Sequence, residues 1–334
     1  MMGTSQSAAR GHDDRSGYLV AGFVLLLVVL CGLVYYKWGG AIRTVSGVRE
    51  LGRWSGTADG LTTGGVLRAT LFYFRRIWIA LAYGLLIGAA VRAFVPPRRQ
   101  VAAGLAGTPL MLCSCCITPI FQSVYERGAR LGSALAVMLA SPGLNPAALL
   151  LTAILFPPSL AVARIAAVLV AVFGLAPLIE RTVGAGLVVA DGRFAPLAAD
   201  DSPRSLKETV ARFAGALGYL TVRTVPLVLG GVLLSSLILP VSLKVSTGGT
   251  PLVVAFVAAV AVLVALPTFF EIPLAMLFVG LGSPGAAAAM LVAGPIVNLP
   301  SLLVLGRETS ARVALAVALG IWLLAVAAGM AVSA

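Results

Sequence analysis

Three cysteines within four positions are the most chemically reactive group in the sequence. They are Cys113, Cys115 and Cys116, in the string Leu-Cys-Ser-Cys-Cys-Ile-Thr-Pro that ends at Pro119. Thiolates are soft ligands that suit Cu(I) and other thiophilic species, and in a helix Cys113 and Cys116 would share a face. The alternative is that they are small apolar residues in tight helix packing, which is how we interpret Cys31.

Two charged residues inside apolar runs are the next candidates. Glu271, between Leu266 and Pro273, is the only acid that the sequence places well inside such a run. An intramembrane carboxylate costs about 2.5–3.5 kcal/mol or more, so Glu271 is a candidate for carrying a proton or meeting a cation. If the segment is a surface loop, Glu271 is merely solvated. Arg223 can pair with Glu271 or an anionic substrate, or extend to the membrane interface.

Two asparagines each stand three residues after a proline, Asn145 after Pro142 and Asn298 after Pro295. Each can contact a substrate, cap the half-helix that follows it, or do both. We predict no catalytic residue, no resident metal and no cofactor. The candidate substrate-binding residues are Cys113, Cys115, Cys116, Asn145 and Asn298, and the candidate proton-coupling residues are Glu271 and Arg223.

The composition indicates the elements that must position these residues. Of 334 residues 60% are hydrophobic and 11% are charged, against roughly 25% charged in soluble domains. This excludes a soluble globule and predicts an all-α, polytopic transmembrane helical bundle. The 24 Lys and Arg against 12 Asp and Glu punctuate apolar runs, which indicates membrane topology and lipid contact and not nucleic-acid binding. A single histidine, His12, excludes an imidazole metal cage or a Ser-His-Asp triad.

Apolar runs of about 20 residues predict the membrane spans. If every run crosses once, the count is nine, uncertain by one, and the two long polar stretches lie on the same side. The basic stretch is assigned to the cytoplasm by the positive-inside rule. The predicted organisation is an N-terminal tail and anchor helix over 1–36, a basic cytoplasmic loop over 37–76, a first membrane repeat over 77–180, a polar linker over 181–213 and a second membrane repeat over 214–334.

The two halves carry the same ordered set of helix-breaking residues. Pro119 precedes Pro142 by about the distance at which Pro273 precedes Pro295, and the Asn motifs follow. Broken hydrophobic segments at corresponding positions of two repeats indicate a transporter's binding site. We therefore expect breaks at 113–119, 141–146, 267–273 and 294–300 to meet at one central site, in repeats that are either parallel or inverted.

The Cys-Ser-Cys string before Pro119, together with both Asn motifs, resembles the ArsP-type predicted permease family over about residues 70–332. The resemblance implies a multi-pass permease of the bacterial inner membrane, and some family members export trivalent organoarsenicals. Family cysteines are matched by Cys113 and Cys115. A departure is Cys116, where family members often have Gly, which adds a third thiol.

The resulting hypothesis is a permease and not an enzyme. It would export a small thiophilic solute, such as a trivalent (organo)arsenical or soft metal species, by proton coupling. No Walker motif is present, so ATP hydrolysis would need another chain. Two alternatives stay open: a transmembrane thiol–disulfide electron carrier using Cys113 and Cys116, and a non-catalytic subunit of a membrane complex. The expected partners are the solute and membrane lipid, without nucleic acid, and the sequence is compatible with a homo-oligomer.

Overall fold

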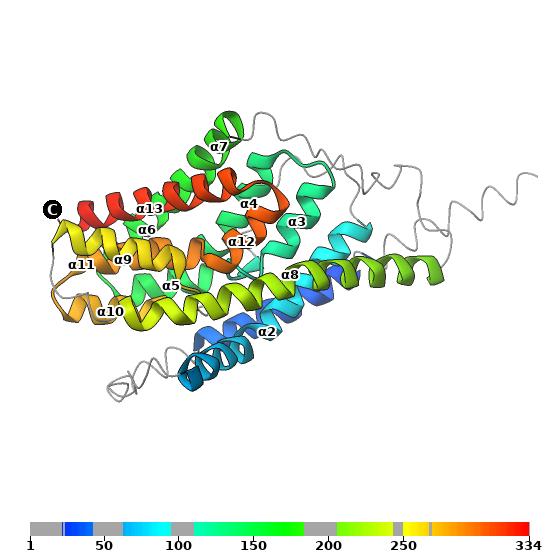
Figure 1. The fold of residues 1–334 in the computed structure, drawn as a ribbon, viewed down its shortest axis with the longest axis horizontal. Coiled ribbons are helices and arrows are strands. Elements are labelled where there is room, and N and C mark those ends of the chain that lie inside the picture. The colour runs from blue at the N-terminus through cyan, green and yellow to red at the C-terminus, as the bar shows by residue number, and fades with distance from the viewer. Residues whose placement is uncertain are drawn as a thin grey trace, which may run out of the picture.

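The computed structural model describes residues 22, 24–42, 63–94, 110–183, 206–242, 250–266 and 269–333. These residues form helices and contain no strand, which confirms the predicted all-α fold (Figure 1). The expectations for the N-terminal tail, and for most of the two long polar stretches, lie outside the described residues.

Four helices among the described residues are long and apolar enough to cross a membrane. They are Val24–Ile42; the continuous segment Pro158–Thr182, made of α6 (Pro158–Val170), the π-helical turn η4 (Ala171–Leu175) and α7 (Ala176–Thr182); Lys207–Ser235 within α8 (Leu206–Ser242); and α13 (Ala311–Ser333). Two bent pairs add up to two more spans, α4 (Leu131–Gly143) with α5 (Pro146–Leu155) at 42° and α11 (Pro284–Ile296) with α12 (Leu299–Glu308) at 43°. The chain is therefore a multi-pass membrane protein.

Three short helices overturn the expectation that every apolar run crosses once. They are α3 (Thr118–Glu126), α9 (Pro251–Leu263) and α10 (Glu271–Gly280). At about 1.5 Å per residue, helices of this length extend only about 14–20 Å, which is less than the roughly 30 Å hydrocarbon core. Each therefore reaches from one side to the centre of the bundle or back.

The prolines determine where the long segments break. Pro142 and Pro295 lie inside the last turns of α4 and α11, where a missing N–H and the ring clash stop the helix from continuing. Pro119 and Pro146 instead occupy the first turns of α3 and α5. There the N–H has no intrahelical partner, so the ring begins a helix without cost.

The elements that the predicted repeat would pair, α3 with α10, run in opposite directions from the centre of the bundle. The ends of α3 and α12 meet through Arg223, which contacts both Glu126 and Glu308, whereas α10 leads from the centre towards α11, whose start packs against the end of α13. Backbone with positive φ precedes α3 at Met111 and α10 at Phe269. These directions favour an inverted arrangement over a parallel one, and the repeat itself stays a prediction.

The start of α2 and the end of α7 lie at opposite ends of the bundle. The helix α2 (Thr63–Phe94) includes residues 63–76, which we had expected to be loop, and it extends about 48 Å at 1.5 Å per residue. Its far end contacts the α3–α4 region through Arg92 and Glu126, and that region contacts the end of α7 through Arg130 and Glu180. The linker after α7 thus starts at the end of α2 opposite to Thr63. If the bundle spans a membrane, only one of the two stretches can be cytoplasmic.

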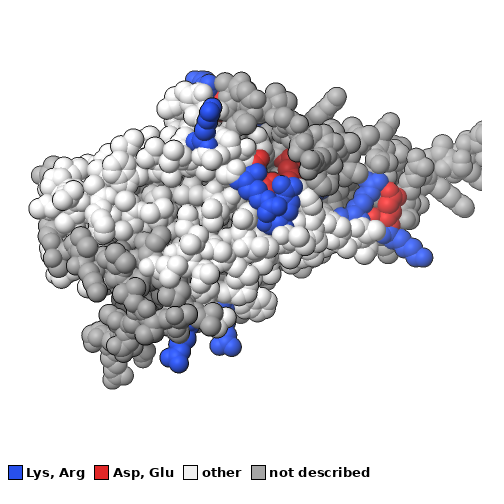
Figure 2. Space-filling view, in the orientation of Figure 1, with Lys and Arg blue, Asp and Glu red and all other residues white. Residues whose placement is uncertain are grey.

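The lipid-facing surface is apolar. Exposed large side chains on α13 recur at Leu315, Leu319 and Leu323, one helical turn apart, and α6 exposes Val162 and Ile165. Figure 2 shows a broad uncharged surface, with most of the charged side chains in view towards the end where α3, α7 and the start of α8 lie. Such an exposed apolar surface fits contact with lipid tails.

Candidate solute-binding site

The cysteine string forms a tight loop that leads into α3. The carbonyl oxygen of Cys113 accepts hydrogen bonds from the N–H groups of Cys116 and Ile117, each at 3.0 Å. The Thr118 hydroxyl donates to the Cys115 carbonyl oxygen at 2.7 Å. These bonds satisfy backbone groups that a helix start leaves open, and they turn three cysteine side chains towards one another.

The three sulfur atoms form a compact buried cluster. The Sγ atom of Cys113 lies 3.2 Å from that of Cys115 and 2.6 Å from that of Cys116, and Cys115 and Cys116 are 3.7 Å apart. All three thiols are free and buried, whereas Cys31 is free and exposed on the N-terminal helix. Three soft ligands this close together can bind one thiophilic centre.

The α2 helix packs closely against the loop and holds it in place. The α2 helix approaches so closely at Gly84 that a Cβ there would lie 2.1 Å from the Cys116 carbonyl oxygen. The Tyr73 hydroxyl of α2 lies 3.9 Å from the Cys115 sulfur and donates to the Leu266 carbonyl oxygen at 3.3 Å. Tyr73 therefore connects the thiol loop with the break between α9 and α10.

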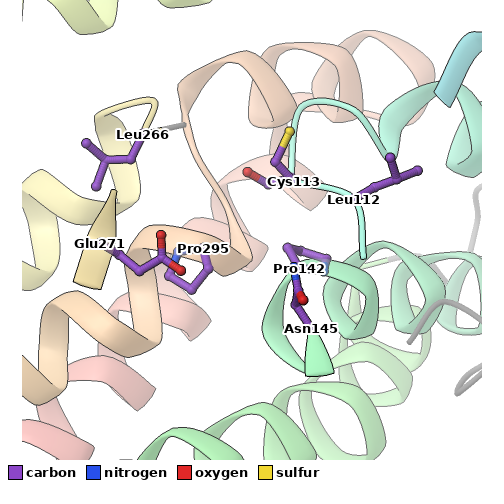
Figure 3. Close-up of a pocket in the computed structure, with 8 residues that line it drawn as sticks. Leu112, Cys113, Pro142, Asn145, Leu266, Glu271 and Pro295 are labelled. Atoms are coloured by element: carbon purple, nitrogen blue, oxygen red, sulfur yellow. The ribbon is translucent and has the colours of Figure 1, made fainter. Parts of the chain in front are cut away.

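A small cavity lies where the four breaks meet, as the sequence predicted (Figure 3). Its volume is about 10 Å³, which is room for about one water molecule. The bundle is therefore closed around this site, and a larger solute needs the helices to move apart. The lining residues are Leu112, Cys113, Ser114, Pro142, Asn145, Leu266, Glu271 and Pro295.

Both asparagines cap the half-helices that follow them. The Asn145 side-chain oxygen accepts from the N–H groups of Ala147 and Ala148 at 3.1 and 3.4 Å, and its amide donates to the Met111 carbonyl oxygen at 3.4 Å. Asn298 accepts from the Ser301 N–H at 3.1 Å in a capping box. Asn145 also lines the cavity, so the cap is observed and contact with a substrate stays a prediction. Asn298 is fully buried beyond the lining.

Glu271 begins α10, is 3% exposed and faces the cavity. Its ion partner is Arg164 of α6, with 3.5 Å between the guanidinium Nη2 and the carboxylate oxygen. Arg164 is fully buried, and its Nη1 donates to the Thr152 hydroxyl at 3.2 Å. Sequence reasoning missed Arg164 because it stands near the start of its apolar run, where a loop assignment was natural. A buried carboxylate requires a cation, so Glu271 was a reason to look for a basic residue inside another apolar run, such as Arg164.

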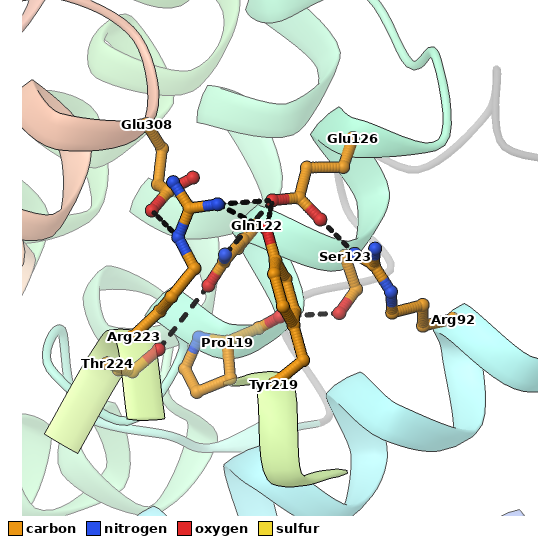
Figure 4. A network of polar contacts seen from close by, with 9 residues as sticks. All are labelled: Arg92, Pro119, Gln122, Ser123, Glu126, Tyr219, Arg223, Thr224 and Glu308. Carbon is orange, nitrogen blue, oxygen red and sulfur yellow. Dashed lines mark hydrogen bonds and ion pairs between the residues drawn. The ribbon is translucent and has the colours of Figure 1, made fainter. Parts of the chain in front are cut away.

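Arg223 belongs to a second polar cluster and does not contact Glu271 (Figure 4). Its Nε lies 3.3 Å from the Glu308 carboxylate at the end of α12, and its Nη1 lies 4.0 Å from Glu126 at the end of α3. It also donates to the Tyr219 hydroxyl. Of the alternatives open for Arg223, pairing with Glu271 is not the one observed, because Arg164 occupies the Glu271 carboxylate.

Glu126 is the centre of this cluster. Its carboxylate accepts from the Tyr219 hydroxyl at 2.8 Å and from the Gln122 amide at 3.0 Å, and it pairs with Arg92 of α2. The Arg92 guanidinium also lies over the Tyr219 ring, 4.5 Å from its centre. These acids were missed because each ends an apolar run, where sequence alone does not distinguish a solvated charge from a buried one.

Comparison with known proteins identifies relatives. The chain is 27% identical to the UPF0718 protein YraQ of Escherichia coli (strain K12) over 330 residues, which cover 92% of this chain and 93% of that protein. It is 40% identical to the UPF0718 protein MJ0584 of Methanocaldococcus jannaschii over 53 residues, 16% of this chain and 14% of that protein. No solved structure matches the chain. The family model ArsP_1, described as a predicted permease, matches residues 99–334, and the chain therefore belongs to this permease family.

Proposed function

We propose that this chain is a permease of the bacterial inner membrane that exports a small thiophilic solute by proton coupling, with a trivalent arsenical or a related soft metal species as the solute class. The observation that supports this most is the cluster of three buried, free thiols beside the cavity at the four helix breaks. Cys113 lines the cavity itself, and its sulfur lies within 3.2 Å of the other two.

The chemistry of solute capture is ligand exchange. A trivalent arsenic hydroxide gives up one As–O bond for each As–S bond that forms, and the released hydroxyl leaves as water with the thiol proton. Arsenic stays trivalent, and the product with three thiols is neutral. A neutral product suits this site because a buried net charge without a partner is strongly disfavoured. Cys116, the additional thiol, would complete a three-sulfur site.

Glu271 is the proposed proton carrier. Its carboxylate faces the cavity and is paired with Arg164 at 3.5 Å, so its protonation would weaken an ion pair between the two halves of the bundle. Intramembrane acids with a named cationic partner are common in proton-driven transporters. In this role Arg164 is the cation released when Glu271 is protonated. Arg223 is not part of this pair, because it contacts Glu126 and Glu308.

The test is flux into everted membrane vesicles, measured for a panel of trivalent arsenicals, soft metal ions and unrelated solutes, with and without a proton gradient. The proposal predicts gradient-dependent accumulation of at least one thiophilic solute and none of the unrelated ones. Vesicles from cells carrying empty vector provide the background. Equal accumulation with and without the chain, for every thiophilic solute, would contradict the proposal.

One observation favours the electron-carrier alternative, namely the 2.6 Å separation of the Cys113 and Cys116 sulfurs. A thiol–disulfide carrier oxidises these two thiols to a disulfide and passes on two electrons and two protons. Against the carrier, the segment of the second half that corresponds to the thiol loop, residues 268–273, contains no cysteine. Trapping by alkylation after addition of an oxidised quinone distinguishes the two, because only the carrier accumulates a Cys113–Cys116 disulfide.

A further inference from the structure

One end of the bundle gathers nearly all of the described basic residues outside the core. At this end, which we call the Glu126 end, α2, α7 and α12 finish and α4, α8 and α13 begin. Among the described residues the first half of α2, towards the opposite end, carries Arg68, Arg75 and Arg76. The basic residues at the Glu126 end are Arg92, Arg127, Arg130, Arg181, Lys207, Arg212, Arg307 and Arg312. By the positive-inside rule we take this end as cytoplasmic, which reverses the side assigned to the stretch 37–76 from the sequence alone.

At the Glu126 end, one arginine joins the two halves. The helices α3 and α12 both start beside the central cavity, and each runs outward for about 14–15 Å at 1.5 Å per residue. Their last residues are Glu126 and Glu308, whose side chains are 14% and 4% exposed. Arg223 of α8 lies between them, at 4.0 Å and 3.3 Å.

Additional contacts hold Arg223 in this bridging position. Its guanidinium donates to the Tyr219 hydroxyl and lies 5.2 Å from the centre of the Tyr219 ring. Tyr219 in turn donates to Glu126, and the adjacent Thr224 donates to Gln122 of α3 at 3.4 Å. On its other side α8 touches α12 so closely that a Cβ at Gly231 would lie 2.6 Å from Pro300. The α8 helix is thus fastened to both α3 and α12.

The opposite end of the bundle is closed differently. The helices α5 and α10 run outward there from the cavity, and their described ends at 153–160 and 278–286 carry no Asp, Glu, Lys or Arg. On that side the ion pair of Arg164 with Glu271 lies deep in the bundle, next to the cavity, and the described outer ends of α5 and α10 meet no charged side chain of their own. The Glu126 end differs in that its charged residues stand at the outer ends of two helices, where a change in one charge can release both.

We propose that Arg223, with Glu126 and Glu308, forms a cytoplasmic gate that closes access to the thiol cavity. When Arg223 releases the ends of α3 and α12, the two halves separate at the Glu126 end and a cytoplasmic solute reaches the thiols. Arg223 is thus a positioning residue, which touches neither the cavity nor the solute. The inference rests on the proposed permease function in one respect: it takes the cavity to lie on the path of the solute.

The experiment measures how fast a membrane-impermeant maleimide labels the native thiols at 113–116, from each side of the membrane. A Cys31→Ser background removes the exposed thiol. Everted vesicles expose the cytoplasmic side and right-side-out vesicles expose the other side. We expect slow labelling of the background protein from both sides, and at least several-fold faster labelling of Glu308→Gln and Arg223→Gln in everted vesicles only. Arg223→Lys, which keeps the charge, should label close to the background rate.

The matched control is Arg130→Gln. Arg130 lies at the same end and pairs with Glu180, but it does not join α3 to α12, so its loss should leave labelling unchanged. Unchanged labelling of both gate variants, or faster labelling from both sides or from the non-cytoplasmic side, would overturn the proposal. If Arg223→Gln does not accumulate, Glu308→Gln decides alone, because it leaves Arg223 paired with Glu126. No solute is required, so faster one-sided labelling without thiophilic transport would support the gate and refute the proposed solute.

Discussion

Glu271 and Arg164 form an ion pair across the interior of the bundle, with 3.5 Å between carboxylate and guanidinium. The two residues come from different halves, Glu271 from α10 and Arg164 from α6, and both are almost completely buried. Each charge therefore requires the other, because neither has access to bulk water. Glu271 is the only carboxylate that lines the cavity, and its charge is compensated by a cation from the other half.

Breaking this pair on one side should destabilise the protein. We predict that Arg164→Gln lowers the unfolding temperature of the purified protein in detergent, since an uncompensated buried charge costs about 3–5 kcal/mol. The double variant Arg164→Gln with Glu271→Gln should recover most of that loss, because no charge remains unpaired. An Arg164→Gln protein as stable as the wild type would show that the pair contributes nothing.

The charge of Glu271 should matter separately for coupling. We predict that Glu271→Gln still binds solute but no longer couples its flux to the proton gradient, because glutamine keeps the shape and hydrogen bonding but cannot titrate. Glu271→Ala should be worse, since it also removes polar contacts at the start of α10. The measurement is flux in everted vesicles as the gradient is dissipated. Gradient-driven flux by Glu271→Gln at the wild-type rate would make Glu271 a purely structural partner of Arg164.

The thiols should be required for transport without being required for folding. We predict that Cys113→Ser and Cys115→Ser each abolish transport of a soft solute, because a hydroxyl is a far poorer ligand for a soft centre. The matched control is Cys31→Ser, which should be silent because Cys31 lies apart on the N-terminal helix and is exposed. Transport by both variants at the wild-type rate, with equal protein in the membrane, would reduce these cysteines to packing residues.

The contact between α2 and the thiol loop gives a further prediction. Gly84→Ala should impair transport and lower the unfolding temperature, because its Cβ would lie 2.1 Å from the Cys116 carbonyl oxygen and the loop would have to move. Gly218→Ala in α8 is the control, since a Cβ there meets nothing within 4 Å. Equal behaviour of the two variants would show that the loop tolerates displacement.

The sequence predicted the central site better than it predicted the path of the chain. Pro and Asn act locally, by removing a donor or capping a helix, so the breaks at Pro142 and Asn145 could be located without a structure. The thiol cluster followed from spacing alone. The number of spans did not, because an apolar run such as 252–280 has the same composition whether it crosses once or turns back in two short helices.

The partners of the charged residues were beyond sequence reasoning for a different reason. Arg164 and Glu271 are far apart in sequence, and their contact exists only after α6 and α10 pack around the cavity. Glu126 and Glu308 stand at the ends of apolar runs, where the sequence does not show whether water or Arg223 compensates them. Pairing depends on tertiary structure, whereas each break depends on a few neighbouring residues.

The most direct test of the thiol site measures arsenic bound to the purified protein. The protein is incubated with a trivalent arsenical in detergent, separated from free arsenical by gel filtration, and analysed for arsenic per chain. The Cys31→Ser protein is compared with a variant that also has Cys113, Cys115 and Cys116 replaced by Ser. We predict about one arsenic atom per chain in the first protein and none in the second, as expected if the three soft ligands share one centre. Equal arsenic in the two proteins would contradict the site.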